Sequence, residues 1–275
     1  MTGRLVLVAT PLGNLADISP RALTVLGSAD AIACEDTRMT RKLLDLVGVA
    51  APPLFAVHEH NESAMVAPVL ARLERGETVA LVTDAGLPAI SDPGERIVRA
   101  AADAGFDVSV VPGPSAFVAA VAISGLPAER LVFEGFLPRK GAGRGRRLSA
   151  IATEPRTVAL YEAPHRLRET LADLASACGA GRRVVLVREL TKLHEEVWRG
   201  TLGGAVELEA APRGEYVIVL EGAPPPPPVS DAVIESVLEG ELARGADRRE
   251  AIASVAGALG VPKRRVYDAA VRLRP

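Results

Sequence analysis

Short β-branched runs alternate with helix-length segments over residues 1–124. The runs are LVLVA at 5–9, AIAC at 31–34, VALVT at 79–83 and VSVV at 108–111, and the helix-length segments cover 37–48, 61–75, 93–104 and 114–124. Strands that alternate with helices in this way predict a largely parallel sheet whose two faces are both covered. The sequence therefore predicts an α/β domain over residues 1–124.

A second set of apolar runs occupies residues 125–223. These runs are LVFEGF at 131–136, TVALYE at 157–162, VVLVREL at 184–190 and EYVIVLEG at 215–222, and a helical pattern extends from Arg166 to about Cys178. The last run follows closely after APRG at 211–214, as the second strand of a hairpin would. This half is predicted to be a second α/β domain with a mixed sheet.

Five consecutive prolines at 224–228 predict a linker that ends the second core. Beyond them, residues 229–275 show apolar positions on both sides of Gly260, with Ser230 placed to begin a helix and Pro262 placed as the first residue of the last one. Two short helices across a glycine turn are typical of a helix-turn-helix and equally of a plain helical cap. The segment is therefore predicted to be a small helical domain of one of these two kinds.

The composition excludes several classes of protein. Apolar residues make up 48% of the chain and the formal net charge is -2, which excludes a disordered tail protein and gives no global sign of polyanion binding. The two cysteines, Cys34 and Cys178, match no metal or disulfide spacing, so we expect no metal site and a cytoplasmic location. The apolar run at 5–9 is too short for a signal peptide core or a membrane span.

The loops after the strands of the first half are the expected ligand site, because open α/β sheets bind ligands outside the carboxyl ends of their strands. They read TPLGN at 10–14, DAGLPAISDPG at 84–94 and PGPSA at 112–116, and none contains a glycine-rich phosphate-binding motif. The carboxylates of Asp84 and Asp92 suit a ligand with hydroxyls and positive charge, such as adenosine linked to an amino acid. In the structural alternative, Asp92 caps the next helix and Asp84 stabilises its own turn.

Seven blocks in register carry a family resemblance. They read VATPLGNLADISPRAL at 8–23, EDTRMTRKLL at 35–44, VTDAGLPAISDPG at 82–94, VPGPSAFVAAVAISGLP at 111–127, FEGFLPRK at 133–140, YEAPHRL at 161–167 and RELTK at 188–192. Together they resemble the small-subunit ribosomal RNA cytidine 2′-O-methyltransferases, a family within the tetrapyrrole methylase superfamily. The segment after the prolines is similar to that family's C-terminal segment, more weakly.

The resemblance implies a fold, a cofactor and a partner. The fold would be two α/β domains with S-adenosyl-L-methionine (SAM) in the cleft between them, assembled as a homodimer. The partner would be 16S rRNA of the small ribosomal subunit, in which a decoding-region cytidine is methylated on its ribose 2′-oxygen.

The resemblance also assigns residues to the site. By position, the cofactor-binding residues are Pro11, Leu12, Asp84, Gly86, Pro88, Asp92, Ser115 and Ala116. Because a ribose hydroxyl is a poor nucleophile, a general base would help, and the candidates are Glu35, Asp36, His165 and Glu189. His165 lies at an expected helix start, which favours its neutral form, whereas Glu35 and Asp36 equally suit a plain helix start. Lys192 is a further catalytic candidate or a phosphate-binding residue.

The strongest basic feature is PRKGAGRGRR at 138–147, which has five positive charges and no acid. Its glycines and arginines predict a mobile loop that becomes ordered on RNA, and the alternative is a solvated linker. The expected RNA-binding residues are Arg139, Lys140, Arg144, Arg146 and Arg147, with Arg38 and Arg41 added by the resemblance and Lys263, Arg264 and Arg265 at the start of the last helix.

Two other functions remain open. A methylase that acts on a tetrapyrrole carbon would share the superfamily, although the basic segment 138–147 and the EDTR and YEAPHRL blocks speak against it. A non-catalytic RNA-binding protein could also keep the fold. SAM binding followed by methyl transfer to small ribosomal subunits separates these possibilities.

Overall fold

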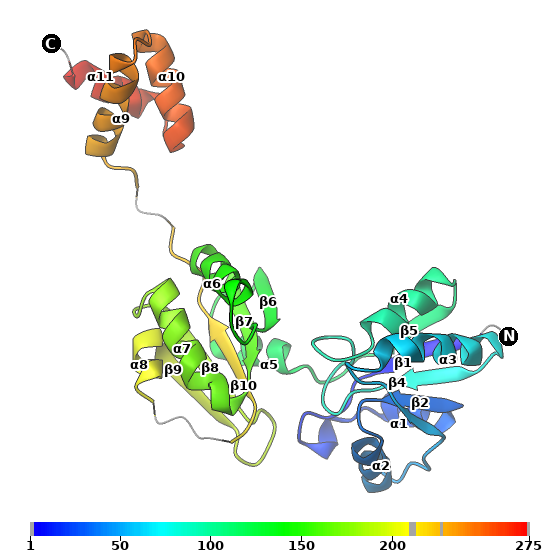
Figure 1. Cartoon of the computed structure of the whole chain (residues 1–275). Helices are drawn as coiled ribbons and strands as arrows, with labels where there is room; N and C mark the ends of the chain where they lie inside the picture. Colours follow the sequence, from blue (N-terminus) through cyan, green and yellow to red (C-terminus); the bar gives the residue numbers. More distant parts are fainter. Residues whose placement is uncertain (1–2, 209–212, 226–227, 274–275) are drawn as a thin grey trace. The chain divides into compact units, whose positions relative to one another are not determined.

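The computed structural model describes residues 3–208, 213–225 and 228–273. The chain divides into two compact units, Met1–Ala223 and Pro224–Pro275 (Figure 1). Over the described ranges, every helix is too short or too polar to cross a membrane.

The first sheet has five parallel strands in the order β3-β2-β4-β1-β5. The strands are β1 (Arg4–Val8), β2 (Ala31–Cys34), β3 (Leu54–Ala56), β4 (Thr78–Leu81) and β5 (Asp107–Val111), and the helices between them are α1 (Pro20–Ser28), α2 (Thr37–Leu46), α3 (Glu62–Glu74) and α4 (Glu95–Asp103), with a short 3-10 turn at Leu15–Asp17. Successive strand residues face opposite sides: Val6 and Val8 pack with α1 and α2, whereas Leu5 packs with α3 and α4. The predicted parallel sheet with both faces covered is confirmed.

The second sheet is mixed and has the order β6-β7-β10-β8-β9. Its strands are β6 (Leu131–Phe136), β7 (Thr157–Glu162), β8 (Arg183–Arg188), β9 (Glu196–Thr201) and β10 (Tyr216–Leu220), and its helices are α5 (Ala116–Ser124), α6 (Ala142–Thr153), α7 (Pro164–Cys178) and α8 (Leu202–Val206). Only β6 and β7 are parallel among the described pairings. One face packs against α6, α7 and α8, and the other packs against α5.

Two strands are absent from the sequence prediction. β3 has only three residues, too few for a recognisable pattern, and β9 is an edge strand with mostly half-buried and exposed residues. β10 does pair antiparallel with β8, but β9 lies between them along the chain, so they do not form a simple hairpin. Of the expected hairpin turn at 211–214, residues 211 and 212 lie outside the described ranges.

Helix α5 packs on the second sheet, although the sequence places it with the first. Its Ala120 and Val121 join the core formed by β7, β8 and β10. Because α5 is apolar on all sides, its sequence shows no stripe that would reveal which sheet it covers.

The prediction of a mobile loop at 138–147 is wrong. Residues from Ala142 onward form the first turns of α6, and Arg144 is buried, with 8% of its side chain exposed. Its guanidinium donates to Asp173 Oδ2 at 2.8 Å, to the Pro138 carbonyl at 3.0 Å and to Thr170 Oγ1 at 3.0 Å. The segment is therefore ordered in spite of its glycines at 141, 143 and 145, because the buried Arg144 joins α6 to α7 by hydrogen bonds.

The second unit has three helices around a core of its own. They are α9 (Asp231–Ala243), α10 (Arg248–Leu259) and α11 (Lys263–Arg272). Ser230 caps α9 as expected, and Gly260 ends α10 with a left-handed φ of 61°. Pro262 is the N-cap of α11 and not its first residue. Within the proline segment, residues 226–227 are not described.

Candidate functional site

A cavity of about 440 Å³ lies at the carboxyl ends of strands of the first sheet and is completed by residues of the second sheet. From the first sheet it takes Leu12 after β1, Glu35 after β2, several residues of the loop from Asp84 to Asp92 after β4, and Ser115 after β5. From the second sheet it takes the ends of β6 and β7 and the start of β10, which meet because Tyr216 pairs antiparallel with Glu162. The cavity therefore lies where open α/β sheets bind their ligands.

Five of the eight residues predicted to bind the cofactor line this cavity: Leu12, Asp84, Asp92, Ser115 and Ala116. The other three, Pro11, Gly86 and Pro88, are buried in the same loops but are not among the lining residues of the described chain. Leu87 and Ile90 add apolar surface to the loop after β4.

Backbone bonds lock the loops after β1 and β4 together. Thr10 and Gly86 form an isolated antiparallel bridge, with Thr10 N donating to the Gly86 carbonyl at 2.9 Å and Gly86 N to the Thr10 carbonyl at 3.1 Å. Gly86 has a φ of +86°, and a Cβ at this position would meet Leu12 Cδ2 at 3.2 Å. Glycine is thus needed both for its backbone conformation and for the close approach to Leu12.

The loop after β4 is strained near the cavity. Ala89 and Ser91 have positive φ angles of 66° and 63°, conformations that side-chain-bearing residues rarely adopt. Within the described ranges, the only other non-glycine residues with a positive φ are Glu189 and Thr191, in the turn after β8. Backbone strain of this kind persists where a functional arrangement requires it.

Asp92 is not the cap of α4. The acceptor at that helix start is the buried Glu62, whose Oε1 accepts from Gly94 N at 3.0 Å and from Arg96 N at 2.8 Å. Asp84 accepts from the backbone N–H of Asp36 at 3.3 Å, so it joins the ends of β4 and β2 and does more than stabilise its own turn. The structure therefore leaves Asp92 to face the cavity.

The cavity is strongly acidic. Its carboxylates are Glu35, Asp84, Asp92, Glu162 and Glu215, and its described lining contains no lysine or arginine. Burial, and then the charge of Glu35, raise the pKa of Asp92 to about 7, although a hydrogen bond from Thr83 acts in the other direction. Partial desolvation and the charge of Glu35 also raise the pKa of Asp84. Thr83 Oγ1 donates to Glu35 Oε2 at 3.0 Å.

The remaining general-base candidates lie in other surroundings. Asp36 caps α2 and accepts from Arg38, which lowers its pKa to about 2, so it is a weak base. His165 is exposed near the start of α7 and is not among the described lining residues. Burial alone would raise the pKa of Glu189, but bonds from Lys192 and from the Glu215 amide hold it below its usual value.

Lys192 forms ion pairs with two glutamates. Its Nζ lies 3.0 Å from Glu189 Oε1 and 2.8 Å from Glu215 Oε2, and its stem packs against Gly13. The Glu215 bond brings Lys192 to the edge of the cavity, because Glu215 is one of the lining residues. A role in holding a phosphate would require it to leave these partners.

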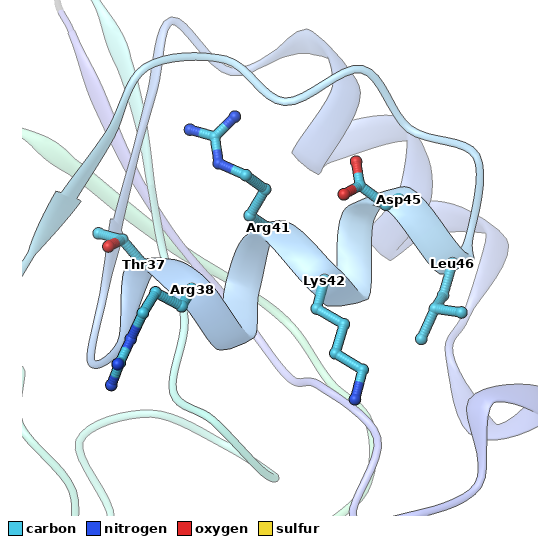
Figure 2. A pocket seen from close by; sticks show the side chains of 6 residues that line it. All are labelled: Thr37, Arg38, Arg41, Lys42, Asp45 and Leu46. Carbon is cyan, nitrogen blue, oxygen red and sulfur yellow. The ribbon is translucent and has the colours of Figure 1, made fainter.

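The basic residues of α2 line a groove of about 470 Å³. Figure 2 shows Arg38 and Lys42 on one side of the helix and Arg41 with Asp45 on the other. Arg38 also donates to both oxygens of Asp36, at 3.2 and 2.7 Å. Lys42 is absent from the sequence prediction, although its spacing of four residues from Arg38 places both on one helical face.

The other predicted RNA contacts divide into exposed and internally paired residues. Arg139, Lys140, Arg146, Lys263 and Arg264 are exposed. By contrast, Arg147 pairs with Glu134, and Arg265 donates to Asp231 at 2.6 Å and to the Val229 carbonyl at 2.9 Å. With the buried Arg144, these two arginines hold the protein's own elements together.

The two sheets with a cavity at their strand ends match solved methyltransferases. The structure of the methyltransferase CobJ superposes with a TM-score of 0.60 at 20% identity, covering 81% of this chain and 95% of that one. Uroporphyrin-III C-methyl transferase from Thermus thermophilus, complexed with S-adenyl homocysteine, gives 0.57 at 18% identity, covering 79% and 96%. The molecule therefore has the tetrapyrrole methylase fold.

Sequence comparison identifies the family. The model of the Tetrapyrrole (Corrin/Porphyrin) Methylases matches residues 4–206. The protein named Ribosomal RNA small subunit methyltransferase I from Synechocystis sp. is 43% identical over 275 residues, 98% of each chain, and its namesake from Xylella fastidiosa is 50% identical over 225 residues, 80% of this chain and 82% of that one. The chain belongs to the tetrapyrrole methylase family and, within it, to the group of small-subunit ribosomal RNA methyltransferases; its cofactor is SAM.

The cavity residues fit this cofactor. The absence of a Cβ at Gly86 leaves room beside Leu12, and carboxylates face the space where a cationic ligand would lie. SAM carries a sulfonium and an amino group, so the surplus of acids matches its charge. Lining residues that sequence reasoning missed include Phe136, Tyr161, Glu162 and Glu215. The rule about strand ends, applied to the second sheet as well as to the first, would have found the first three, because they lie at the ends of β6 and β7.

Proposed function

We propose that this protein transfers a methyl group from SAM to the ribose 2′-oxygen of a cytidine in the decoding region of 16S rRNA. It acts in the cytoplasm as a homodimer. The observation that carries the proposal is the 43% identity, over 98% of both chains, to a protein named Ribosomal RNA small subunit methyltransferase I. The geometry supports it with an acidic cavity and exposed cations on surrounding elements.

The acidic residues of the cavity favour the binding of SAM over the binding of its demethylated product. SAM supplies an activated methyl group and loses its sulfonium charge on transfer. Because Asp84, Asp92 and Glu35 face the cavity, they favour the cationic cofactor over the product, which lacks that charge. The same acids thereby favour product release.

The carboxylates of the cavity are the best placed to take the proton of the ribose hydroxyl. The charge of Glu35 helps to raise the pKa of Asp92 to about 7, and this value gives Asp92 the basicity that a general base needs near neutral pH. Glu35 was a candidate from the sequence, whereas Asp92 was assigned there to the cofactor. We propose that this pair, and not His165, accepts the proton.

The RNA would contact exposed cations. Arg139, Lys140 and Arg146 lie on the segment that follows β6, whose last residue lines the cavity, and Arg38, Arg41 and Lys42 lie on α2. Each lysine or arginine that meets a phosphate releases counterions, so affinity would fall with salt.

Isothermal titration with SAM, followed by transfer of a labelled methyl group to under-methylated small ribosomal subunits, tests the proposal. We expect SAM binding and labelling of a single cytidine, with the methyl group on the ribose as read from an alkali-resistant dinucleotide. Labelling of a base would overturn the 2′-oxygen assignment. Labelling of a tetrapyrrole precursor and not of RNA would favour the other substrate class of the family. Sedimentation of the purified protein tests the homodimer.

A further inference from the structure

Phe136 is an exposed aromatic residue on the rim of the cavity. It is the last residue of β6, it lines the cavity, and 49% of its surface remains exposed. Solvent exposure of a phenylalanine costs free energy that burial would recover. Its position on the rim therefore calls for an occupant that covers its face.

A β-bulge directs this ring. The register between β6 and β7 shifts between Phe133 and Gly135, and Gly135 has a φ of +60°. A Cβ on Gly135 would lie 3.0 Å from Ser91 Oγ in the strained loop after β4, so β6 passes close to the cavity at this point. Bulges beside active sites typically re-aim one side chain. Here the bulge immediately precedes Phe136.

The ring is supported from behind by other aromatic residues. Phe136 lies 5.6 Å from the Tyr161 ring, which lies 5.0 Å from Phe133, which in turn stacks on Phe117 at 4.2 Å. The Tyr161 hydroxyl accepts from Phe117 N at 3.3 Å, which fixes the support. The chain has only five phenylalanines, three tyrosines and one tryptophan, so this cluster uses a large share of them in one place.

A base stacking on Phe136 follows from the chemistry of the proposed reaction. A methyl acceptor must come within about 3.5 Å of the methyl group, so the target nucleotide has to leave its stack and enter the rim of the cavity. Its base then needs a flat apolar face, and the flanking phosphates need cations. Arg139 and Lys140, three and four residues after Phe136, are exposed.

We propose that Phe136 is the platform on which the extruded base of the target nucleotide stacks, with Arg139 and Lys140 holding the adjoining backbone. This inference rests on the proposed function and adds to it a specific binding residue and a base-flipping step. The carboxylates around Asp92 act on the ribose while Phe136 holds the base.

The test compares Phe136→Ala, Phe136→Leu and Phe136→Trp with the parent protein. The measurements are kcat/KM for under-methylated small ribosomal subunits and the Kd for SAM by titration. Stacking is lost in the alanine and leucine variants, so kcat/KM falls by about 10- to 100-fold, whereas tryptophan keeps it within about threefold. The SAM Kd stays within about twofold in all three. Val110→Ala, at a residue with a similar exposed fraction of 46% on β5, is the control and stays at the parent value.

Three results overturn the stacking role. The first is an unchanged kcat/KM in Phe136→Ala, and the second is a leucine variant as active as tryptophan, which would indicate only apolar packing. The third is a SAM Kd weakened as much as kcat/KM, which would place the cofactor on this ring. If Phe136→Ala does not fold, the comparison of kcat/KM between Phe136→Leu and Phe136→Trp still tests the stacking role. A parent protein that binds SAM but leaves ribosomal subunits unmethylated removes the proposed function itself, and stacking with it.

Discussion

Asp92 shows how a single residue changes meaning between sequence and structure. In the sequence it precedes a proline and a glycine, a context in which a helix cap is the ordinary role. The structure gives the cap to Glu62, which lies thirty residues earlier at the start of α3. No local pattern could reveal this exchange, because it depends on how α3 and α4 pack side by side.

The raised pKa of Asp92 predicts a pH-dependent stability in the absence of cofactor. Its pKa is about 7 in the folded state against an ordinary 3.8, so folding binds a proton between these values. Stability from this group is complete below about pH 4 and is lost as the pH rises through 7. In Asp92→Asn the side chain carries no charge at any pH, so the variant does not lose this stability as the pH rises. We expect near-equal unfolding free energies at pH 4, a growing difference between pH 4 and 7, and an advantage of about 2 kcal/mol for the variant at pH 8, after screening is allowed for.

Urea unfolding of the cofactor-free protein at pH 4, 5, 6, 7 and 8 measures this difference. Asp107→Asn, which removes an exposed partner of Arg4, serves as the control and shows no such gain at high pH. Parallel stability curves for Asp92→Asn and the parent would show that Asp92 ionises normally.

Glu62 predicts a second effect at the residue scale, because one buried carboxylate satisfies two backbone donors. In Glu62→Ala, Gly94 N and Arg96 N lose their acceptor, and the expected cost is about 2 kcal/mol. Glu62→Gln keeps a carbonyl acceptor and costs about half as much. Chemical denaturation of both variants, with the exposed Glu95→Ala as control, checks the order. Equal losses in Ala and Gln would mean that the negative charge of the carboxylate, and not the presence of an acceptor oxygen, determines the cost.

At the scale of elements, α6 differs most from its sequence expectation. Glycine at 141, 143 and 145 indicates flexibility, and the helix forms because tertiary bonds from Arg144 to α7 outweigh that propensity. The parallel sheet and the cavity loops after β1, β4 and β5 were predictable, because a strand period and its turn residues are local signals. By contrast, two features were not predictable, because they depend on contacts between residues far apart in the sequence. These are the packing of α5 on the second sheet and the contribution of β10 to the cavity lining.

Arg144 and Arg146 form a matched pair on α6. Arg144→Ala removes the partner of Asp173 and one of the two partners of Thr170, whose hydroxyl also donates to Glu162, and should cost about 3 kcal/mol of unfolding free energy. Arg146→Ala should leave stability within about 0.5 kcal/mol, because its side chain is exposed. If Arg146 contacts RNA, its loss lowers the slope of log affinity against log salt by about 1, with SAM affinity unchanged.

Thermal unfolding and salt-dependent binding to small ribosomal subunits distinguish the two variants. Lys140→Ala repeats the binding test at a second exposed cation. A stable Arg144→Ala protein would contradict the structural role of that arginine. An unchanged salt slope in both Arg146→Ala and Lys140→Ala would remove this segment from the RNA surface.

The whole molecule consists of units with separate cores. Four clusters of buried apolar residues draw only on residues 1–223, and the fifth draws only on residues after the prolines, as far as the described residues show. The cavity is likewise lined only from the first unit. The run of prolines between them interrupts any element that might continue across it.

Removal of the second unit should therefore leave the cofactor site intact. A chain ending at Ala223 should bind SAM with a Kd within about twofold of the parent and unfold within about 3 °C of the parent's main transition, because no buried cluster of the described residues is cut. Calorimetry and titration with SAM measure both quantities.

On small ribosomal subunits, the same truncation separates the two roles left open for the helical segment. A helix-turn-helix that contacts RNA would raise KM and flatten the salt dependence, since Lys263 and Arg264 are lost. A plain cap would leave KM unchanged and lower the unfolding temperature of the first unit by more than about 3 °C, which would contradict the expectation of independent stability.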